Sequence, residues 1–242
     1  MNRRLRTSVL FTVLQEAAIA HTEELGMGRE KTLDRGLLWI VTMQRAEVLR
    51  MPHYDEDIIL RSWPGRTMHL LFPRYFSLET ASGEPLLKAS SIWSLIDEKT
   101  RALIFPEKYG IEIEGVITGD EISLPSSPRP LKKPASDEQP EGLIIASKYF
   151  TVPYSFTDLN GHMNNTRYFD LAEDLITESV PGFSAQAGHT EALSPRLIST
   201  EFSKEVRLGE SITFRLEGQD GTFYITGTNA SGQICFKMRM EI

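Results

Sequence analysis

The order of expected secondary structure repeats once along this chain, and that repeat limits the fold more than any other feature. Each half combines one helical run with several strand-like runs of alternating or continuous apolar residues. The strand-like runs of the first half cover residues 37–48, 58–63, 74–80 and 86–97. Those of the second half cover residues 144–156, 198–207, 211–217, 222–228 and 233–241. A sheet that wraps one long helix buries the apolar faces of both, so the pattern predicts an α+β protein built from two equivalent layers.

One helix is expected in each half. The first starts at Thr12-x-x-Gln15, which resembles a capping box, and stops at Gly26 and Gly28. The second follows Asn164 and Asn165, either of which is a good helix cap. The spacing of apolar residues predicts that its buried face holds Tyr168, Leu171, Ala172, Leu175 and Ile176.

Residues 120–142 differ in character from the rest of the chain. Prolines recur through this stretch, at Pro125, Pro128, Pro130, Pro134 and Pro140. Because proline cannot donate to a strand ladder and the stretch lacks apolar periodicity, it is expected to be a linker. The linker would separate an N-terminal domain, residues 1–119, from a C-terminal domain, residues 143–242.

Composition narrows the class of protein. A formal net charge of -7 argues against a general nucleic-acid binder. The single cysteine, Cys235, excludes an intrachain disulfide and a cysteine-based zinc site, and it fits a reducing compartment. No apolar run approaches the ~20 residues that span a bilayer, and the basic start lacks the apolar core of a signal peptide. We therefore expect a cytoplasmic protein without membrane insertion, bound metal or cofactor.

The densest set of chemically active side chains is Asp158, Asn160 and His162. These residues alternate, so an extended segment would place them on one side. The helix that follows offers free backbone N–H groups and the positive end of its dipole. The pattern thus predicts a polar site at the mouth of a helix. On the residues alone, Asp-x-Asn-Gly is equally good turn chemistry and His162 a candidate structural histidine, so both interpretations stay open.

The stretch Asp-x-Asn-x-His-Met-Asn-Asn-x-x-Tyr, residues 158–168, resembles the signature of the acyl-[acyl-carrier-protein] thioesterases, a branch of the hotdog-fold thioesterases. Residues 36–52 and 89–101 resemble first-domain strands of that family, and residues 200–205 resemble the strand that carries its catalytic glutamate. The resemblance implies two tandem hotdog domains. It places the active site in the second and an acyl-chain tunnel in the first. Since the start of the chain lacks a plastid-type extension, we expect a bacterial relative.

The activity implied by the resemblance is hydrolysis of fatty acyl-[acyl-carrier-protein], which releases a free fatty acid and terminates fatty acid synthesis. A thioester carbonyl needs an activated water or a carboxylate nucleophile, together with stabilisation of the oxyanion. Glu205 is the first choice for the base. His162 would hydrogen-bond the carbonyl oxygen or the water, and Asn160 would orient the water or the substrate. Asp158 would fix the His162 tautomer or compete with Glu205 as the base.

A cysteine mechanism is not expected for this chain. Plant relatives often carry a cysteine directly after the glutamate, and here that position is Val206. Cys235 is expected to be structural, on the strand face that it would share with Gln233, Lys237 and Arg239.

The expected partner is an acyl carrier protein, which is acidic in this family and would need a local basic surface. Candidate basic residues are Arg3, Arg4 and Arg6 at the start, and Arg129, Lys132 and Lys133 in the linker. Two other functions fit the same residues: an acyl-CoA thioesterase, and a non-catalytic acyl-binding hotdog protein. Whether the chain forms a homodimer is left open.

Overall fold

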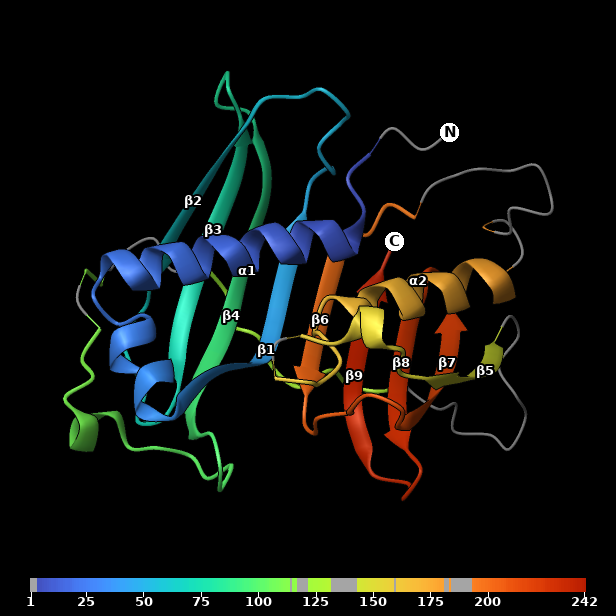
Figure 1. Cartoon of the computed structure of the whole chain (residues 1–242). Coiled ribbons are helices and arrows are strands. Elements are labelled where there is room, and N and C mark those ends of the chain that lie inside the picture. The colour runs from blue at the N-terminus through green and yellow to red at the C-terminus, as the bar shows by residue number, and fades with distance from the viewer. Residues whose placement is uncertain are drawn as a thin grey trace.

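The computed structural model describes residues 4–113, 115–116, 122–131, 143–158, 160–180, 183 and 193–242. In this part of the chain, nine strands form one antiparallel sheet in the order β2-β3-β4-β1-β6-β9-β8-β7-β5. The strands are β1 (Leu37–Val48), β2 (Ile58–Pro64), β3 (Phe72–Thr80), β4 (Pro85–Asp97), β5 (Ile144–Thr151), β6 (Leu197–Phe202), β7 (Ser211–Gln219), β8 (Thr222–Asn229) and β9 (Ile234–Glu241). Two α-helices, α1 (Thr7–Glu24) and α2 (Arg167–Ser179), lie on the same face of this sheet (Figure 1).

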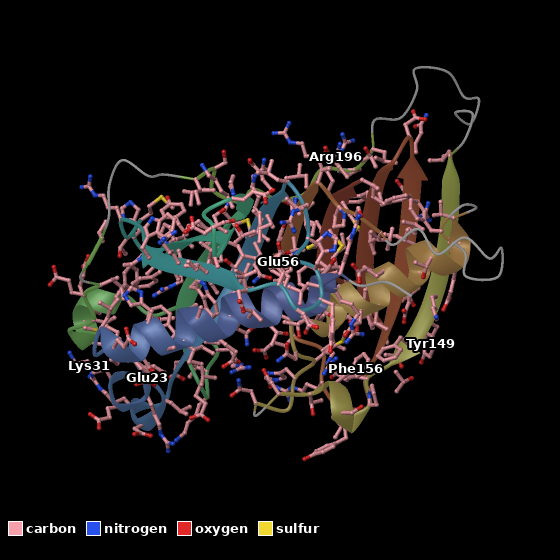
Figure 2. The ribbon with its side chains drawn as sticks, turned by 90° about the horizontal axis from the view of Figure 1, so that it is seen from above. Glu23, Lys31, Glu56, Tyr149, Phe156 and Arg196 are labelled. Carbon is pink, nitrogen blue, oxygen red and sulfur yellow. The ribbon has the colours of Figure 1, made fainter. Side chains whose placement is uncertain are left out.

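The two layers expected from the sequence are joined into one continuous sheet. Strand β1 of the first half pairs with β6 of the second, with Met43 opposite Glu201 and Glu47 opposite Leu197. Pairing these strands satisfies backbone groups that two separate sheets would each leave open at an edge. The helices also meet, since the rings of Phe11 and Phe169 stack with centroids 4.1 Å apart. Figure 2 shows the helices from above, running end to end along the sheet.

The core lies between the helices and the sheet and includes residues of both halves. Leu10 and Leu14 of α1 share one cluster with Leu175 and Ile176 of α2 and with strand residues such as Ile198. Full burial of a leucine, isoleucine or phenylalanine side chain contributes about 1.5–3 kcal/mol. The continuous core therefore packs both helices against the same sheet.

Helix α1 begins at Thr7, so the capping box expected at Thr12 is wrong. The Thr12 hydroxyl lies inside the helix and donates to the Ser8 carbonyl oxygen at 2.9 Å. Leu10 and Phe11 are buried, and their packing makes the helix begin before Thr12. Tertiary packing supplies most of a helix's stability and so outweighs the local capping signal. In α2, all five residues expected on the buried face are buried.

Strand β9 differs from the expected alternation at its start. Phe236, Met238 and Met240 are buried as expected, but Ile234 is 42% exposed while Cys235 is fully buried. The pairing of β8 with β9 shifts by one residue at this point, and a bulge reverses the two faces of a strand. The placement of Cys235 with Lys237 and Arg239 is therefore wrong.

Two strands of the second half end earlier than expected. Strand β5 stops at Thr151 and is followed by the short 3₁₀ helix η4 (Tyr154–Phe156), and β6 stops at Phe202. Residues 122–131 of the expected linker contain no helix or strand, whereas Lys132 and Lys133 lie outside the described residues, as does Arg3. Among the described helices, none is long and apolar enough to cross a membrane.

Candidate active site

The segment from Thr157 to Met163 forms a tight turn. Thr157 and Met163 pair as an antiparallel bridge, and Gly161 takes a left-handed backbone with φ of 74°. The Asp158 carboxylate oxygen Oδ1 accepts the backbone N–H groups of Asn160 and His162, at 2.8 and 3.3 Å. The expectation of three side chains along one side of an extended segment is therefore wrong. The reason is local, since an aspartate that bonds backbone N–H groups ahead of it favours a turn.

This geometry assigns Asp158 a structural contact. In the described part of the chain, both hydrogen bonds of its carboxylate go to backbone N–H groups and none to the imidazole of His162. The turn itself fixes the position of the His162 backbone. Asp158 thus shapes the segment that carries His162.

Glu205 reaches His162 from a loop between β6 and β7, and not from a strand as expected. Backbone pairing holds this loop against the turn, because Met163 N–H donates to the Val206 carbonyl oxygen at 2.7 Å and His162 pairs with Arg207. His162 Nε2 lies 3.2 Å from Glu205 Oε2. The His162 side chain is 13% exposed and that of Glu205 is 37% exposed, so the pair faces a solvent-accessible space.

Arg101 completes this cluster, and sequence reasoning missed it. It follows β4, in the first half of the chain, and forms an ion pair with both carboxylate oxygens of Glu205, with Arg101 Nε at 3.2 Å from Oε2. Arg101 Nη2 lies 3.2 Å from His162 Nδ1. Because arginine only donates, the neutral His162 tautomer with hydrogen on Nε2 satisfies both contacts: Nδ1 accepts from Arg101 and Nε2 donates to Glu205.

The backbone of Arg101 is in the left-handed region, with φ of 59°. That conformation is uncommon for a residue with a side chain, and such outliers concentrate at functional sites. The turn is held by Asp97, whose carbonyl oxygen accepts the Arg101 N–H at 2.9 Å. Arg101 ends one of the stretches that carried the family resemblance, but only the folded chain brings it to His162 and Glu205.

A cavity of about 820 Å³ contains these groups. Its lining includes all four residues expected from the sequence, Asp158, Asn160, His162 and Glu205, together with Arg101. The N-terminal end of α2 contributes Asn164, Asn165 and Tyr168. Asn164 ties this end together, since its side-chain oxygen accepts the N–H and the hydroxyl of Thr166, both at 2.9 Å.

A second cavity of about 520 Å³ adjoins the first on the side of the N-terminal half. Most of its wall is apolar, from residues such as Leu37, Leu38, Phe72 and Trp93. Trp39 and Asn160 line both cavities. The polar site and the apolar cavity therefore share a wall.

Among the described residues, neither a thiol nor a cluster of metal-binding side chains lies at this site. Cys235 is fully buried in β9, outside both cavities, and burial raises the pKa of its thiol. Over the described residues, no group of three or more His, Cys, Asp or Glu side chains is arranged to hold a metal ion. The reactive groups that the site presents are a carboxylate, an imidazole and a carboxamide.

Comparison with known families agrees with this architecture. Residues 1–108 match the model of the acyl-ACP thioesterase N-terminal domain, and residues 144–241 match that of the acyl-ACP thioesterase C-terminal domain. The chain belongs to the acyl-ACP thioesterase family.

Similar curated proteins are chloroplastic plant enzymes. An acyl-[acyl-carrier-protein] hydrolase of Cuphea viscosissima is 28% identical over 194 residues, which cover 73% of this chain and 43% of that relative. A dodecanoyl-[acyl-carrier-protein] hydrolase of Cinnamomum camphora is 25% identical over 234 residues, or 92% of this chain and 55% of that relative. The chain thus spans about half the length of the curated relatives it matches.

Solved structures show the same fold. An acyl-ACP thioesterase from Bacteroides thetaiotaomicron superposes with a TM-score of 0.77 at 21% identity, covering 100% of this chain and 91% of that one. A 12:0-ACP thioesterase from Umbellularia californica gives a TM-score of 0.74 at 21% identity, covering 99% and 90%. The large antiparallel sheet with two helices on one face is therefore shared with these proteins.

Proposed function

We propose that this protein hydrolyses the thioester of fatty acyl-[acyl-carrier-protein] and releases a free fatty acid, the step that terminates fatty acid synthesis. The observation that carries the proposal is the contact between His162 and Glu205 in a cavity that adjoins an apolar one. Membership of the acyl-ACP thioesterase family supports the substrate, since the relatives are named for the hydrolysis of acyl-[acyl-carrier-protein].

We propose the following chemistry. Glu205 accepts a proton from a water molecule as the water oxygen attacks the thioester carbonyl carbon. Breakage of the carbon–sulfur bond then releases the thiol, and the proton passes to the sulfur. Asn160 orients the water or the carbonyl. As Glu205 takes the proton it becomes a weaker acceptor, so the Nε2–H of His162 turns from Glu205 to the carbonyl oxygen that gains charge. Positioned acid–base groups of this kind contribute about 10²–10⁴-fold to rate.

Arg101 and Asp158 act through these groups in the proposed site. The guanidinium of Arg101 holds both oxygens of Glu205 and so fixes the carboxylate relative to the imidazole. Asp158 holds the turn that carries Asn160 and His162. In this account Asp158 is a turn-forming residue and Glu205 is the base.

We propose that the fold consists of two hotdog units that share one sheet. Helix α1 lies over β3, β4 and β1, and α2 lies over β9, β8 and β7 (Figure 1). Under this proposal the first unit is residues 1–119, the linker 120–142 and the second unit 143–242. The separate matches to N- and C-terminal family models support that division. The first unit would provide the acyl-chain tunnel and the second most of the chemistry.

An acyl carrier protein is the proposed partner. Of the basic residues considered for docking, Arg4 contacts Ser194 and Arg6 lies 4.0 Å from Asp170, so both are engaged with the chain itself. Arg129 is exposed and is the remaining candidate in the described residues.

The test is hydrolysis by purified protein of acyl-[acyl-carrier-protein] substrates of graded chain length, with matched acyl-CoA substrates and the His162→Ala variant alongside. The proposal expects thiol release from the carrier-protein substrates, faster than from acyl-CoA, and its loss in the variant. Faster hydrolysis of acyl-CoA would instead favour an acyl-CoA thioesterase. Binding of acyl-[acyl-carrier-protein] without turnover would favour an acyl-binding protein.

A further inference from the structure

The N-terminal half contains a buried arginine that no acidic side chain neutralises. Arg74, on β3, is only 5% exposed. Its hydrogen-bond partners are His21 Nδ1 at 3.0 Å, the Ser62 hydroxyl at 3.0 Å and the Thr22 hydroxyl at 3.1 Å. No ion pair to Arg74 is formed in the described part of the chain. Buried charges in proteins are normally paired, so this guanidinium needs an explanation.

The partner histidine adds no negative charge. Since arginine only donates, His21 Nδ1 must accept the hydrogen bond, which requires a neutral imidazole. Burial and the charge of Arg74 both lower the pKa of His21, which keeps it neutral. Burial lowers the pKa of Arg74 to about 10, so its guanidinium is still cationic at neutral pH. The cluster of Arg74, His21, Ser62 and Thr22 therefore carries one positive charge.

This cationic cluster borders the apolar cavity. Arg74 and Thr22 line the 520 Å³ cavity, whose other walls include Leu37, Phe72 and Trp93. The hydrogen bonds to described residues use three of the five guanidinium N–H groups. Donors at the wall of an apolar pocket fix the orientation and identity of a ligand. The remaining donors are thus suited to an oxygen atom on a ligand in this cavity.

The ligand would arrive from the candidate active site. Trp39 and Asn160 line both cavities, so an acyl chain whose thioester lies beside Asn160 extends into the cavity that Arg74 borders. A methyl end there would offer no acceptor to the guanidinium N–H groups beyond the three that His21, Ser62 and Thr22 accept. An oxygen function at the same place would complete its hydrogen bonding and, as a carboxylate, would also balance its charge.

We propose that the N-terminal cavity selects acyl chains that carry an oxygen function, as a hydroxyl, oxo or carboxylate group, toward their far end, and that Arg74 binds this oxygen. The proposal rests on the proposed acyl thioester hydrolysis and names its substrate class. A site built to hydrogen-bond a polar group discriminates strongly against an analogue that lacks it, because the buried donor then stays unpaired. The competing explanation is that Arg74 only ties α1 to β2 and β3.

The kinetic test uses acyl-[acyl-carrier-protein] substrates of equal chain length that end in methyl, hydroxyl or carboxylate, over a series of lengths. Wild-type protein is expected to prefer an oxygenated chain by about tenfold or more in kcat/KM at one length, mostly through KM, as expected for a charge-assisted hydrogen bond. Arg74→Met should remove this preference, so that methyl-ended and oxygenated chains of equal length give similar kcat/KM. The matched control, Arg61→Met on the neighbouring strand β2, replaces an exposed arginine and should behave as wild type.

A second measurement does not depend on turnover. Free α,ω-dicarboxylic acids should raise the thermal midpoint of wild-type protein more than monocarboxylic acids of equal length, and this difference should vanish in Arg74→Met. If Arg74→Met fails to fold, Arg74→Lys, which keeps the charge but loses the planar fork, should fold and show a reduced preference.

The outcomes separate the two proposals. Absence of hydrolysis with every chain would refute the proposed function, and the thermal measurement would still decide on the cavity. Hydrolysis without preference for oxygenated chains, at any length, would overturn the inference about Arg74. If both Arg74 variants lost hydrolysis of methyl-ended and oxygenated chains equally, Arg74 would have only a structural role. That result would also overturn the inference about Arg74.

Discussion

His162 Nε2 lies 3.2 Å from Glu205 Oε2, and this contact joins the turn before α2 to the loop after β6. Neither residue is on a regular strand. Backbone pairing between the turn and the loop, including the 2.7 Å bond from Met163 N–H to the Val206 oxygen, sets the distance between them. Main-chain contacts thus hold the turn and the loop together, while the side chains of Asp158 and Arg101 shape the turn and orient Glu205.

His162→Ala is expected to lower kcat by at least about 100-fold, since it removes a group that would hydrogen-bond the reacting carbonyl or water. The turn should persist, because its hydrogen bonds come from the backbone and from Asp158. Steady-state hydrolysis and the thermal midpoint would be measured together. His53→Ala, which removes an exposed histidine, is the control and should retain wild-type rates. A His162→Ala variant with wild-type turnover would remove the imidazole from the mechanism.

Arg101→Met is expected to lower kcat by about 10–100-fold with a smaller change in KM, because Glu205 loses the guanidinium that orients it. Arg101→Lys keeps the positive charge but lacks the planar guanidinium, so its kcat should fall between those of Arg101→Met and wild type. Lys99→Met, in the same turn but exposed, serves as the control. A fall in thermal midpoint with unchanged kcat would mean that Arg101 is merely structural.

Cys235→Ala is expected to keep kcat within about twofold and to lower the free energy of unfolding by about 1 kcal/mol, since it deletes one buried atom. Burial raises the pKa of the thiol and shields it, so iodoacetamide should not inactivate the folded wild-type protein. Both effects are read from residual hydrolysis after incubation. Rapid inactivation of wild type, absent in Cys235→Ala, would argue for a role of the thiol.

Glu173→Gln is expected to stabilise the protein at neutral pH. Burial in α2 raises the pKa of Glu173 above its usual 4.5, and the side chain contacts the Thr7 hydroxyl. The folded state therefore binds the proton more tightly than the unfolded state. Its stabilising contribution is complete below pH 4.5 and is lost as the pH rises through the folded-state pKa.

The thermal midpoint of Glu173→Gln should accordingly lie about 2–4 °C above that of wild type at pH 7. In a chain of this size such a shift corresponds to about 1 kcal/mol of unfolding free energy. Near pH 4 the increase in midpoint should be smaller. Glu178→Gln, on the exposed side of the same helix, should show no such pH-dependent gain. A larger gain at low pH than at neutral pH would contradict the assignment.

The sequence predicts the sheet well where apolar patterning decides the structure. The expected range of β1 coincides with the observed strand, and its position between β4 and β6 agrees with its apolar composition. Local signals fail where tertiary contacts override them. Burial of Leu10 and Phe11 moves the start of α1, and a bulge turns Cys235 inward.

The sequence named four residues that lie together in the folded chain, but it did not give their geometry. Asp158, Asn160, His162 and Glu205 all line one cavity. However, the turn that Asp158 closes was only an open alternative, and Glu205 was expected on a strand. Arg101 could not be assigned at all, because no local pattern links the end of β4 to the turn before α2. Those segments come together in the folded chain, where β1 pairs with β6 and joins the two halves into one sheet.

The central claim is that Glu205 is the base and that Asp158 builds the turn. The direct measurement is kcat of Glu205→Gln and Asp158→Asn on the same acyl-[acyl-carrier-protein]. Asparagine keeps an oxygen that can accept the backbone N–H groups now bound to Asp158, so Asp158→Asn should stay within about tenfold of wild type. Glu205→Gln should lose at least about 100-fold. Near wild-type turnover by Glu205→Gln together with an inactive Asp158→Asn would contradict the account and make Asp158 the base.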